Sequence, residues 1–317
     1  MEDSIRNFPK QFSLELVLEN GDRLPKKKRF VLGGMGGSHL SASLYNTFRP
    51  EVSLLIHKNY GLPTLSEEDK KETLFIASSF SGETEETLSF AEEAMKQGLS
   101  LAVIAERGPL LSLAKQNGIP CIDIPDLPIE PRQASPVFLL ALCLLLGDKA
   151  LEEDLRKIGP TIDPEILREE GKVLAESLRG KTPLLYGSVE NRTLLQNWKV
   201  KLNETAKSPC FFNVFPELNH NEMEGFGGDS ADKFHFILFL DEADHSRTKK
   251  RMRIFENLFS ARGFSFSKVE ISGEARTEKI LRVILLGEWM ALFLAEKNGI
   301  LNHDTPLIRE FKEKLRE

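Results

Sequence analysis

Short apolar runs alternate with helical patterns along most of this chain, and this alternation restricts the fold more than any other feature of the sequence. In the first half the expected strands are residues 29–32, 52–56, 74–77, 101–104 and 121–124, and the expected helices are residues 38–46, 83–96, 109–116 and 135–146. In the second half the expected strands are residues 183–186, 211–215, 234–240 and 264–271, and the expected helices are residues 192–206, 246–261, 277–297 and 306–315. Strands that alternate with helices form parallel sheets covered on both faces. We therefore expect an α/β fold of two tandem three-layer sandwiches, each with a mainly parallel sheet.

The length and one charged stretch predict where the two domains meet. A chain of 317 residues suggests about two domains. Residues 148–157, and the helical pattern that continues through residue 178, lack strand character and are expected to join the two sandwiches. The predicted domains are therefore residues 1–150 and 151–317.

Composition argues against several partners. The net charge is −6, from 42 basic and 48 acidic residues, and the one basic cluster that we single out, residues 26–29, is expected in a solvated turn. Nucleic acid is therefore not an expected partner. The longest apolar run, residues 137–146, is too short to cross a membrane.

Cysteine usage and the first residues predict a cytoplasmic protein. The three cysteines, Cys121, Cys143 and Cys210, form no metal-binding spacing. Such a sparse, odd number suits a reducing compartment. The chain begins with an acidic segment, residues 1–3, which is unlike a signal peptide.

A hydroxyl-rich segment, residues 79–84, lies where a predicted strand passes into a predicted helix. It contains Ser79, Ser81 and Thr84 around Gly82. Free backbone N–H groups and the helix dipole attract an anion at such a junction, and hydroxyls add further donors. The segment therefore predicts a pocket for a phosphate ester. The alternative is that these residues only cap the helix and form a turn.

A glycine-rich turn, residues 33–38, provides a second predicted phosphate-binding element. Its glycines, including Gly37, let the backbone approach a ligand closely, and Ser38 ends the turn. A dinucleotide fingerprint fails because His39 stands where its third glycine belongs, and no Walker A pattern is present. A small phosphate ester therefore fits better than NAD or ATP. Tight strand–helix packing alone remains the alternative.

Glu204 and His220 are candidates for proton transfer. Glu204 lies off the apolar stripe of its predicted helix, near the C-terminal end, where the helix dipole would raise the pKa of a carboxyl group. His220 lies in a polar segment, residues 216–222, and can exchange a proton near neutral pH. A solvated glutamate and a histidine beside a helix cap are the alternatives. No metal spacing involves the single histidines His235, His245 and His303.

Arg132 and two residues near the C-terminus complete the candidates. Arg132 follows the fifth predicted strand, at the edge where open α/β sheets bind ligands, and its guanidinium could stabilise an oxyanion. Thr305 can cap the last helix, whose first turn suits Pro306. Lys312 follows in the same predicted helix, where a solvent-exposed lysine without a function is the alternative to a role in the site.

Together these segments resemble the bifunctional phosphoglucose/phosphomannose isomerase family of the sugar isomerase (SIS) domain superfamily. The resemblance covers almost the whole chain, in matching order. It rests on residues 34–38, 79–84, 131–132, 203–207, 216–222 and 304–306. The hydroxyl-rich segment and the Glu-Leu-Asn-His-Asn-Glu segment are fairly specific as a pair, whereas the glycine turn alone is not.

The resemblance implies a role for each candidate. Gly37, Ser38, Ser79, Ser81 and Thr84 would bind the substrate phosphate. Glu204 would be the catalytic base, Arg132 would stabilise the enediolate, His220 and Lys312 would assist ring opening, and Thr305 would leave room for both C2 epimers. The implied substrate is a hexose 6-phosphate, with no metal or organic cofactor. The implied assembly is a homodimer in which His220 reaches the site of the neighbouring subunit.

Two other functions stay open beside this one. They are a sugar-phosphate sensor without catalysis, and an isomerase that is restricted to one hexose phosphate or acts on another phosphosugar. A glutamine-dependent amidotransferase is not expected, because it needs an N-terminal cysteine nucleophile and residues 1–3 supply none. The chain also departs from the family pattern at His39, where small residues are usual. The isomerase reading requires the hydroxyl-rich segment and Glu204 to act on the same substrate.

Overall fold

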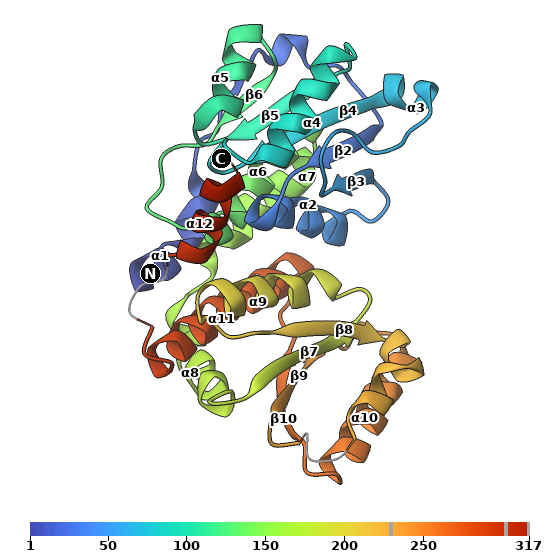
Figure 1. Ribbon diagram of the computed structural model, residues 1–317, viewed down its shortest axis with the longest axis vertical. Helices are drawn as coiled ribbons and strands as arrows, with labels where there is room; N and C mark the ends of the chain where they lie inside the picture. The colour runs from blue at the N-terminus through green and yellow to red at the C-terminus, as the bar shows by residue number, and fades with distance from the viewer. Residues whose placement is uncertain (228–230, 301–303, 316–317) are drawn as a thin grey trace. The chain divides into compact units, whose positions relative to one another are not determined.

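The computed structural model describes residues 1–227, 231–300 and 304–315, and the chain divides into two compact units (Figure 1). The first unit is Asn7–Ile162, and the second combines Met1–Arg6 with Asp163–Glu317. Each unit contains a sheet of its own, with helices packed on both of its faces. The expected α/β architecture of two tandem sandwiches is confirmed.

The first unit is built on a six-stranded sheet in the order β1-β6-β5-β4-β2-β3. Its strands are β1 (Leu18–Glu19), β2 (Arg29–Gly33), β3 (Ser53–His57), β4 (Thr73–Ser79), β5 (Leu101–Ala105) and β6 (Cys121–Asp123). All neighbouring pairs are parallel except β1 with β6. β4 is central and is buried along its whole length, which explains its continuous apolar run.

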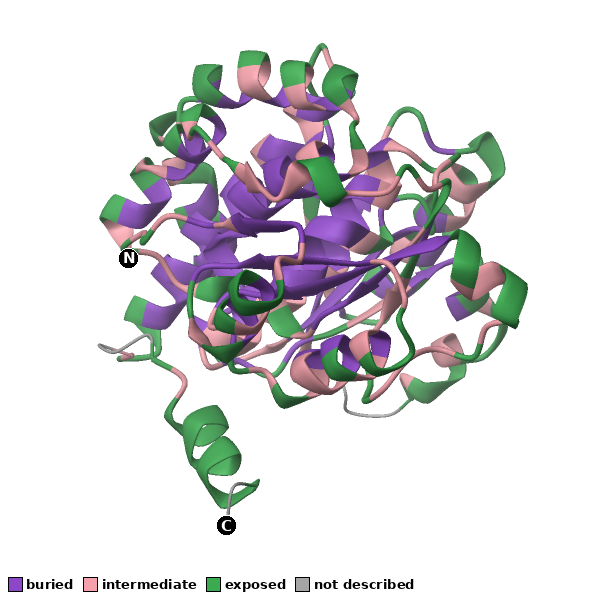
Figure 2. Cartoon of the chain, turned by 90° about the horizontal axis from the view of Figure 1, so that it is seen from above, coloured by how far each residue is buried: buried purple, intermediate pink, exposed green. Residues whose placement is uncertain are grey.

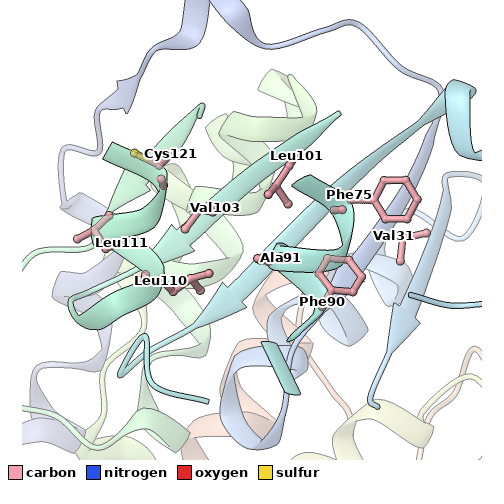
Figure 3. Close-up of a cluster of buried hydrophobic side chains, with 13 residues drawn as sticks. Val31, Phe75, Phe90, Ala91, Leu101, Val103, Leu110, Leu111 and Cys121 are labelled. Atoms are coloured by element: carbon pink, nitrogen blue, oxygen red, sulfur yellow. The ribbon is translucent and has the colours of Figure 1, made fainter. Parts of the chain in front are cut away.

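Helices cover both faces of this sheet because successive strand residues point to opposite sides. α4 (Glu85–Lys96) and α5 (Gly108–Asn117) pack on one face, where Phe90 and Leu110 meet Phe75 and Val103 (Figure 3). α2 (Gly36–Phe48) and α6 (Ser135–Leu146) pack against each other. α2 contacts β2, β3 and β4, and α6 contacts β5. Almost every residue of α6 is buried. The remaining helices of the unit are α3 (Glu67–Glu72) and α7 (Lys149–Ile158).

The second unit has a four-stranded, fully parallel sheet in the order β10-β9-β7-β8. Its strands are β7 (Thr182–Ser188), β8 (Phe211–Phe215), β9 (Phe234–Leu240) and β10 (Ser265–Glu270). An aromatic core joins this sheet to α10 (Ser246–Ser260), with the ring of Phe236 close to those of Tyr186 and Phe255. α8 (Arg168–Ser177) and α9 (Arg192–Glu204) each pack against α11 (Arg276–Lys297).

Short elements complete the two units. They are α1 (Glu2–Arg6) and the 3-10 helices η1 (Phe8–Ser13), η2 (Gly21–Arg23), η3 (Pro131–Gln133), η4 (Gly159–Thr161), η5 (Glu165–Leu167), η6 (Glu217–His220) and η7 (Glu222–Gly225). The last helix, α12 (Pro306–Leu315), has no buried residue and is exposed along its length in Figure 2. None of the described helices has both the length and the apolar character that a bilayer crossing requires.

Candidate active site

Two loops that follow neighbouring strands meet at the carboxyl edge of the first sheet. β2 and β4 are parallel, with Gly33 opposite Ala77. The glycine turn (residues 33–38) begins at the last residue of β2, and the hydroxyl-rich segment (residues 79–84), here called the hydroxyl loop, begins at the last residue of β4. Because α2 and α4 start at these loops, the positive ends of two helix dipoles lie at this edge, as in other anion-binding α/β sites.

Predicted phosphate-binding hydroxyls are held by hydrogen bonds at these loops. The backbone N–H of Phe80 donates to Ser38 Oγ at 3.1 Å, which ties the glycine turn to the hydroxyl loop. The hydroxyls of Ser79 and Thr84 lie 3.0 Å apart, and the N–H of Gly82 donates to Ser79 Oγ at 3.1 Å. Thr84 is the N-cap residue of α4, yet its side chain makes no capping hydrogen bond. Its hydroxyl therefore faces the loop instead of serving the helix end.

Ser81 lies in the middle of the hydroxyl loop and is partly exposed. Its Oγ accepts a hydrogen bond from the N–H of Glu83 at 3.3 Å. The adjacent Gly82 has a φ of +66°, and a Cβ there would come within 1.8 Å of the carbonyl oxygen of Arg107. Only glycine fits this close approach, so the loop is fixed against the start of α5.

The glycine turn contacts the segment that carries Arg132. A Cβ on Gly37 would lie 2.6 Å from the carbonyl oxygen of Pro131 and 3.1 Å from the Cα of Arg132. The missing side chain thus lets the two backbones touch. The structure thereby brings Arg132 to the edge where the phosphate-binding candidates lie.

The Arg132 side chain is almost fully buried, with 2% of the residue exposed. It starts from η3, whose first turn is closed by reciprocal hydrogen bonds between Glu130 and Gln133. Its Nη1 also lies 3.4 Å from Glu130 Oε2. A buried guanidinium held by a carboxylate keeps its orientation and its charge, which are the properties needed to stabilise a developing oxyanion.

His39, the departure from the family pattern, is buried beside the glycine turn. Burial, with a smaller contribution from the charge of Lys58, lowers the pKa of His39 to about 4. The imidazole is therefore uncharged at neutral pH. It adds no positive charge to the candidate phosphate site.

Glu204 is the last residue of α9, at the negative end of the helix, as the sequence predicts. The Lys207 ammonium donates to the carbonyl oxygen of Glu204 at 2.6 Å and also to the carbonyl oxygen of Asp304. Lys207 thus connects the end of α9 to the residue before Thr305. Two candidates that lie a hundred residues apart in sequence, Glu204 and Thr305, are brought close by one lysine.

The polar segment of residues 216–222 is anchored by its last residue. The Tyr186 hydroxyl and the Asn213 side-chain amide both donate to the carboxylate of Glu222. Burial raises the pKa of Tyr186, so its hydroxyl keeps its proton and remains a donor. His220 in the same segment is exposed. The anchor therefore fixes the segment and leaves the imidazole accessible.

Lys312 is exposed on α12. His303 lies outside the described residues. Within the described part of the chain, no three His, Cys, Asp or Glu side chains are grouped so that they could hold a metal ion.

Comparison with known proteins gives nearly full-length matches. A bifunctional phosphoglucose/phosphomannose isomerase of Aquifex aeolicus is 30% identical over 99% of this chain and 97% of its own length. One from Caldicellulosiruptor bescii is 31% identical over 93% of both chains. The chain belongs to the bifunctional phosphoglucose/phosphomannose isomerase family.

The family model and solved structures agree with this membership. Residues 167–315 of this phosphoglucose/phosphomannose isomerase family member match the model described as bacterial phospho-glucose isomerase C-terminal SIS domain. The tagatose-6-phosphate ketose/aldose isomerase of Escherichia coli superposes with a TM-score of 0.68 at 12% identity, over 95% of this chain and 93% of that one. At such low identity the likeness shows the fold alone.

Sequence reasoning missed a buried ion pair one helical turn before Glu204 in this family member. Lys201 on α9 is fully buried, and its Nζ lies 3.1 Å from Oε1 of Glu288 on α11. Its ammonium also donates to the side chain of Asn197 and to the carbonyl oxygen of Ile284. The signal was present, because Lys201 falls on the apolar stripe of α9 and Glu288 interrupts an otherwise apolar run.

Proposed function

We propose that this chain is an aldose–ketose isomerase that interconverts glucose 6-phosphate and mannose 6-phosphate with fructose 6-phosphate through a cis-enediol(ate). The proposal rests on nearly full-length identities of 30% and 31% with relatives that carry the name of this activity. In this role the protein acts in glycolysis and gluconeogenesis, on a hexose 6-phosphate and with no cofactor.

In this proposal the first domain holds the substrate phosphate. The hydroxyls of Ser38, Ser79, Ser81 and Thr84 and the backbone at Gly37 bind its oxygens. Support comes from the hydrogen bonds that join these loops at the carboxyl edge of the sheet, beside two helix N-termini. Binding energy from the phosphate then orients the distant reacting carbons.

Glu204 in the second domain is the proposed base. It removes the proton from C2 of the open-chain aldose and returns a proton to C1, with the proton from the C2 hydroxyl balancing the one that the C1 oxygen gains. The enediolate formed between these steps carries negative charge on oxygen, which the guanidinium of Arg132 stabilises. Because C2 is planar in the enediolate, one base serves both epimers.

The remaining candidates act before and around this step. His220 and Lys312 transfer protons between the ring oxygen and the anomeric hydroxyl as the sugar ring opens. Thr305 is small enough to let the C2–C3 bond rotate, which lets glucose and mannose 6-phosphate react at one site. The exposed position of His220 is compatible with a role in the site of a partner subunit, and we propose a homodimer.

The location and the rival functions can also be addressed. Three unpaired, buried cysteines suit a reducing compartment, so we propose a cytoplasmic location. A sensor without catalysis is not favoured by the relatives, whose names are those of enzymes. An isomerase of another phosphosugar is tested by the same assay as the proposal.

The decisive experiment replaces the proposed base. Glu204→Gln is expected to lower kcat for both glucose 6-phosphate and mannose 6-phosphate by roughly a thousandfold. The amide cannot accept a proton, while its size preserves the binding of fructose 6-phosphate. Coupled assays on both substrates, with calorimetry for binding, measure the two effects. Unchanged turnover in the variant rejects Glu204 as the base, and a wild-type protein inactive on both substrates rejects the proposed reaction.

A further inference from the structure

α10 carries basic side chains on both of its flanks, a feature that the sequence analysis passed over when it singled out residues 26–29. Arg247, Lys250 and Arg251, here called the basic trio, have helical spacings that place them on one face. Lys249 and Arg253 share a different face by the same spacing rule. Buried residues such as Met252 hold the helix to the sheet between the two flanks.

A hollow lies beside each flank of the helix. The hollow beside the basic trio has a volume of about 320 Å³ and is also lined by Asn219 and Met223. Its apolar lining includes the exposed Ile254 and the buried ring of Phe255. A volume of this size is at the lower end for small-molecule sites in proteins.

The two hollows differ in charge. The one beside Lys249 and Arg253 has a volume of about 440 Å³ and contains carboxylates, and there Lys249 pairs with Glu242 at 2.9 Å and Lys268 with Glu256 at 2.9 Å. Among the residues that the structure describes, no carboxylate lines the hollow beside the basic trio. Its positive charge is therefore not compensated from its own walls.

The contacts of the basic trio agree with this difference. Within residues 1–227, 231–300 and 304–315, neither Arg247 nor Lys250 forms an ion pair. Arg251 Nη1 donates to Asn219 Oδ1 at 3.3 Å, and this acceptor is neutral. Three cations thus border one hollow, and their donors are available for charge-assisted hydrogen bonds.

We propose that this hollow is a second anion site, separate from the hydroxyl loop. It would take a small organic anion that carries at least two phosphate or carboxylate groups. Arginine matches the geometry of either group with two parallel hydrogen bonds, and lysine adds a third charge. The apolar lining suits the carbon skeleton that connects the anionic groups. The site does not depend on the proposed isomerase activity.

Titration of the full chain with inorganic pyrophosphate tests the site. The double variant Arg247→Gln/Lys250→Gln is expected to raise the pyrophosphate Kd by about tenfold or more, because two charge-assisted contacts are lost. The matched double variant Lys249→Gln/Arg253→Gln removes the same charge from the other flank. It is expected to change Kd by less than about twofold once salt screens long-range effects.

A third variant separates this site from the candidate phosphate loops. Ser79→Ala/Ser81→Ala is expected to keep the pyrophosphate binding that Arg247→Gln/Lys250→Gln weakens. Three results would overturn the proposal: no pyrophosphate binding by the wild-type chain, equal loss in both α10 variants, or loss only in the serine variant. None of the four substituted α10 side chains is buried. Circular dichroism checks that each variant folds.

Discussion

At the scale of single residues, the glycine turn controls how closely Arg132 approaches the candidate phosphate site. Gly37→Ala would place a methyl group 2.6 Å from the carbonyl oxygen of Pro131, so one of the two backbones must move. We expect the KM for fructose 6-phosphate to rise by about tenfold, because the loop and the guanidinium lose their alignment.

Gly225→Ala is the matched control for this prediction, since within the described part of the chain a Cβ there meets no atom within 4 Å apart from its chain neighbours. Steady-state kinetics on the two variants measure the difference. Equal KM values in Gly37→Ala and the wild-type chain would show that the close approach does not matter for substrate binding.

Two buried histidines make the stability of the chain dependent on pH. Burial lowers the pKa of His39 and of His235 to about 4 in the folded state, with a smaller contribution from a nearby lysine in each case. The unfolded chain therefore takes up these protons first as the pH falls. Stability is complete above the unfolded pKa of about 6.5 and is lost progressively toward pH 4.

His39→Asn is expected to remove the contribution of His39 to the loss of stability at acid pH. Between pH 7.5 and pH 5, each buried histidine lowers the free energy of unfolding by about 2 kcal/mol. The variant should therefore lose about 2 kcal/mol less than the wild-type chain over that interval. Urea denaturation at both pH values measures this, with the exposed His245→Asn as control. Parallel losses in His39→Asn and wild type would contradict the prediction.

At the scale of elements, apolar periodicity carried most of the fold. Each strand and helix that the sequence analysis expected is present and ends within two residues of its predicted limits. α3 was missed because its residues are all charged and none is buried, although Ser66 caps it by accepting from the N–H of Asp69. β1 was missed because two residues show no period. Elements without an apolar repeat cannot be predicted from hydrophobic periodicity.

The same limit applies to the candidate site. The hydroxyl loop and the glycine turn were predictable because strand, loop and helix are continuous in sequence. Two contacts join residues about a hundred positions apart in the sequence. Gly37 touches the Pro131 backbone, and the Lys207 ammonium connects the carbonyl oxygens of Glu204 and Asp304. Such contacts depend on how elements that are far apart in the sequence pack together, which local patterns do not specify.

The buried pair of Lys201 and Glu288 fixes α9 to α11 near the proposed base. Lys201→Met alone would leave a buried carboxylate without its cation, and we expect the free energy of unfolding to fall by about 3–5 kcal/mol. Lys201→Met/Glu288→Leu removes both charges and should recover most of that loss. Urea unfolding of the two single variants and the double variant gives the coupling energy. Additive losses would show that the two side chains do not stabilise each other.

At the scale of the whole molecule, the proposed reaction makes a prediction about assembly. If His220 acts in the site of a partner subunit, a dimer that mixes Glu204→Gln and His220→Asn chains contains one site with both replacements and one site with neither. Each variant alone should be nearly inactive. Random exchange of subunits should then restore up to about a quarter of the wild-type activity, because half of the dimers are mixed and each has one intact site.

Differently tagged chains allow this test to be made on the mixed dimer itself. The two variants are co-expressed with separate affinity tags, purified through both tags, and assayed with fructose 6-phosphate. Co-expressed, doubly tagged Glu204→Gln chains are the control, since no arrangement of their subunits contains an intact site. If Glu204 and His220 of one chain served the same site, every site in the mixed dimer would lack one of them. An inactive mixed dimer would therefore reject the shared site while leaving the roles of both residues open to the single-variant assays.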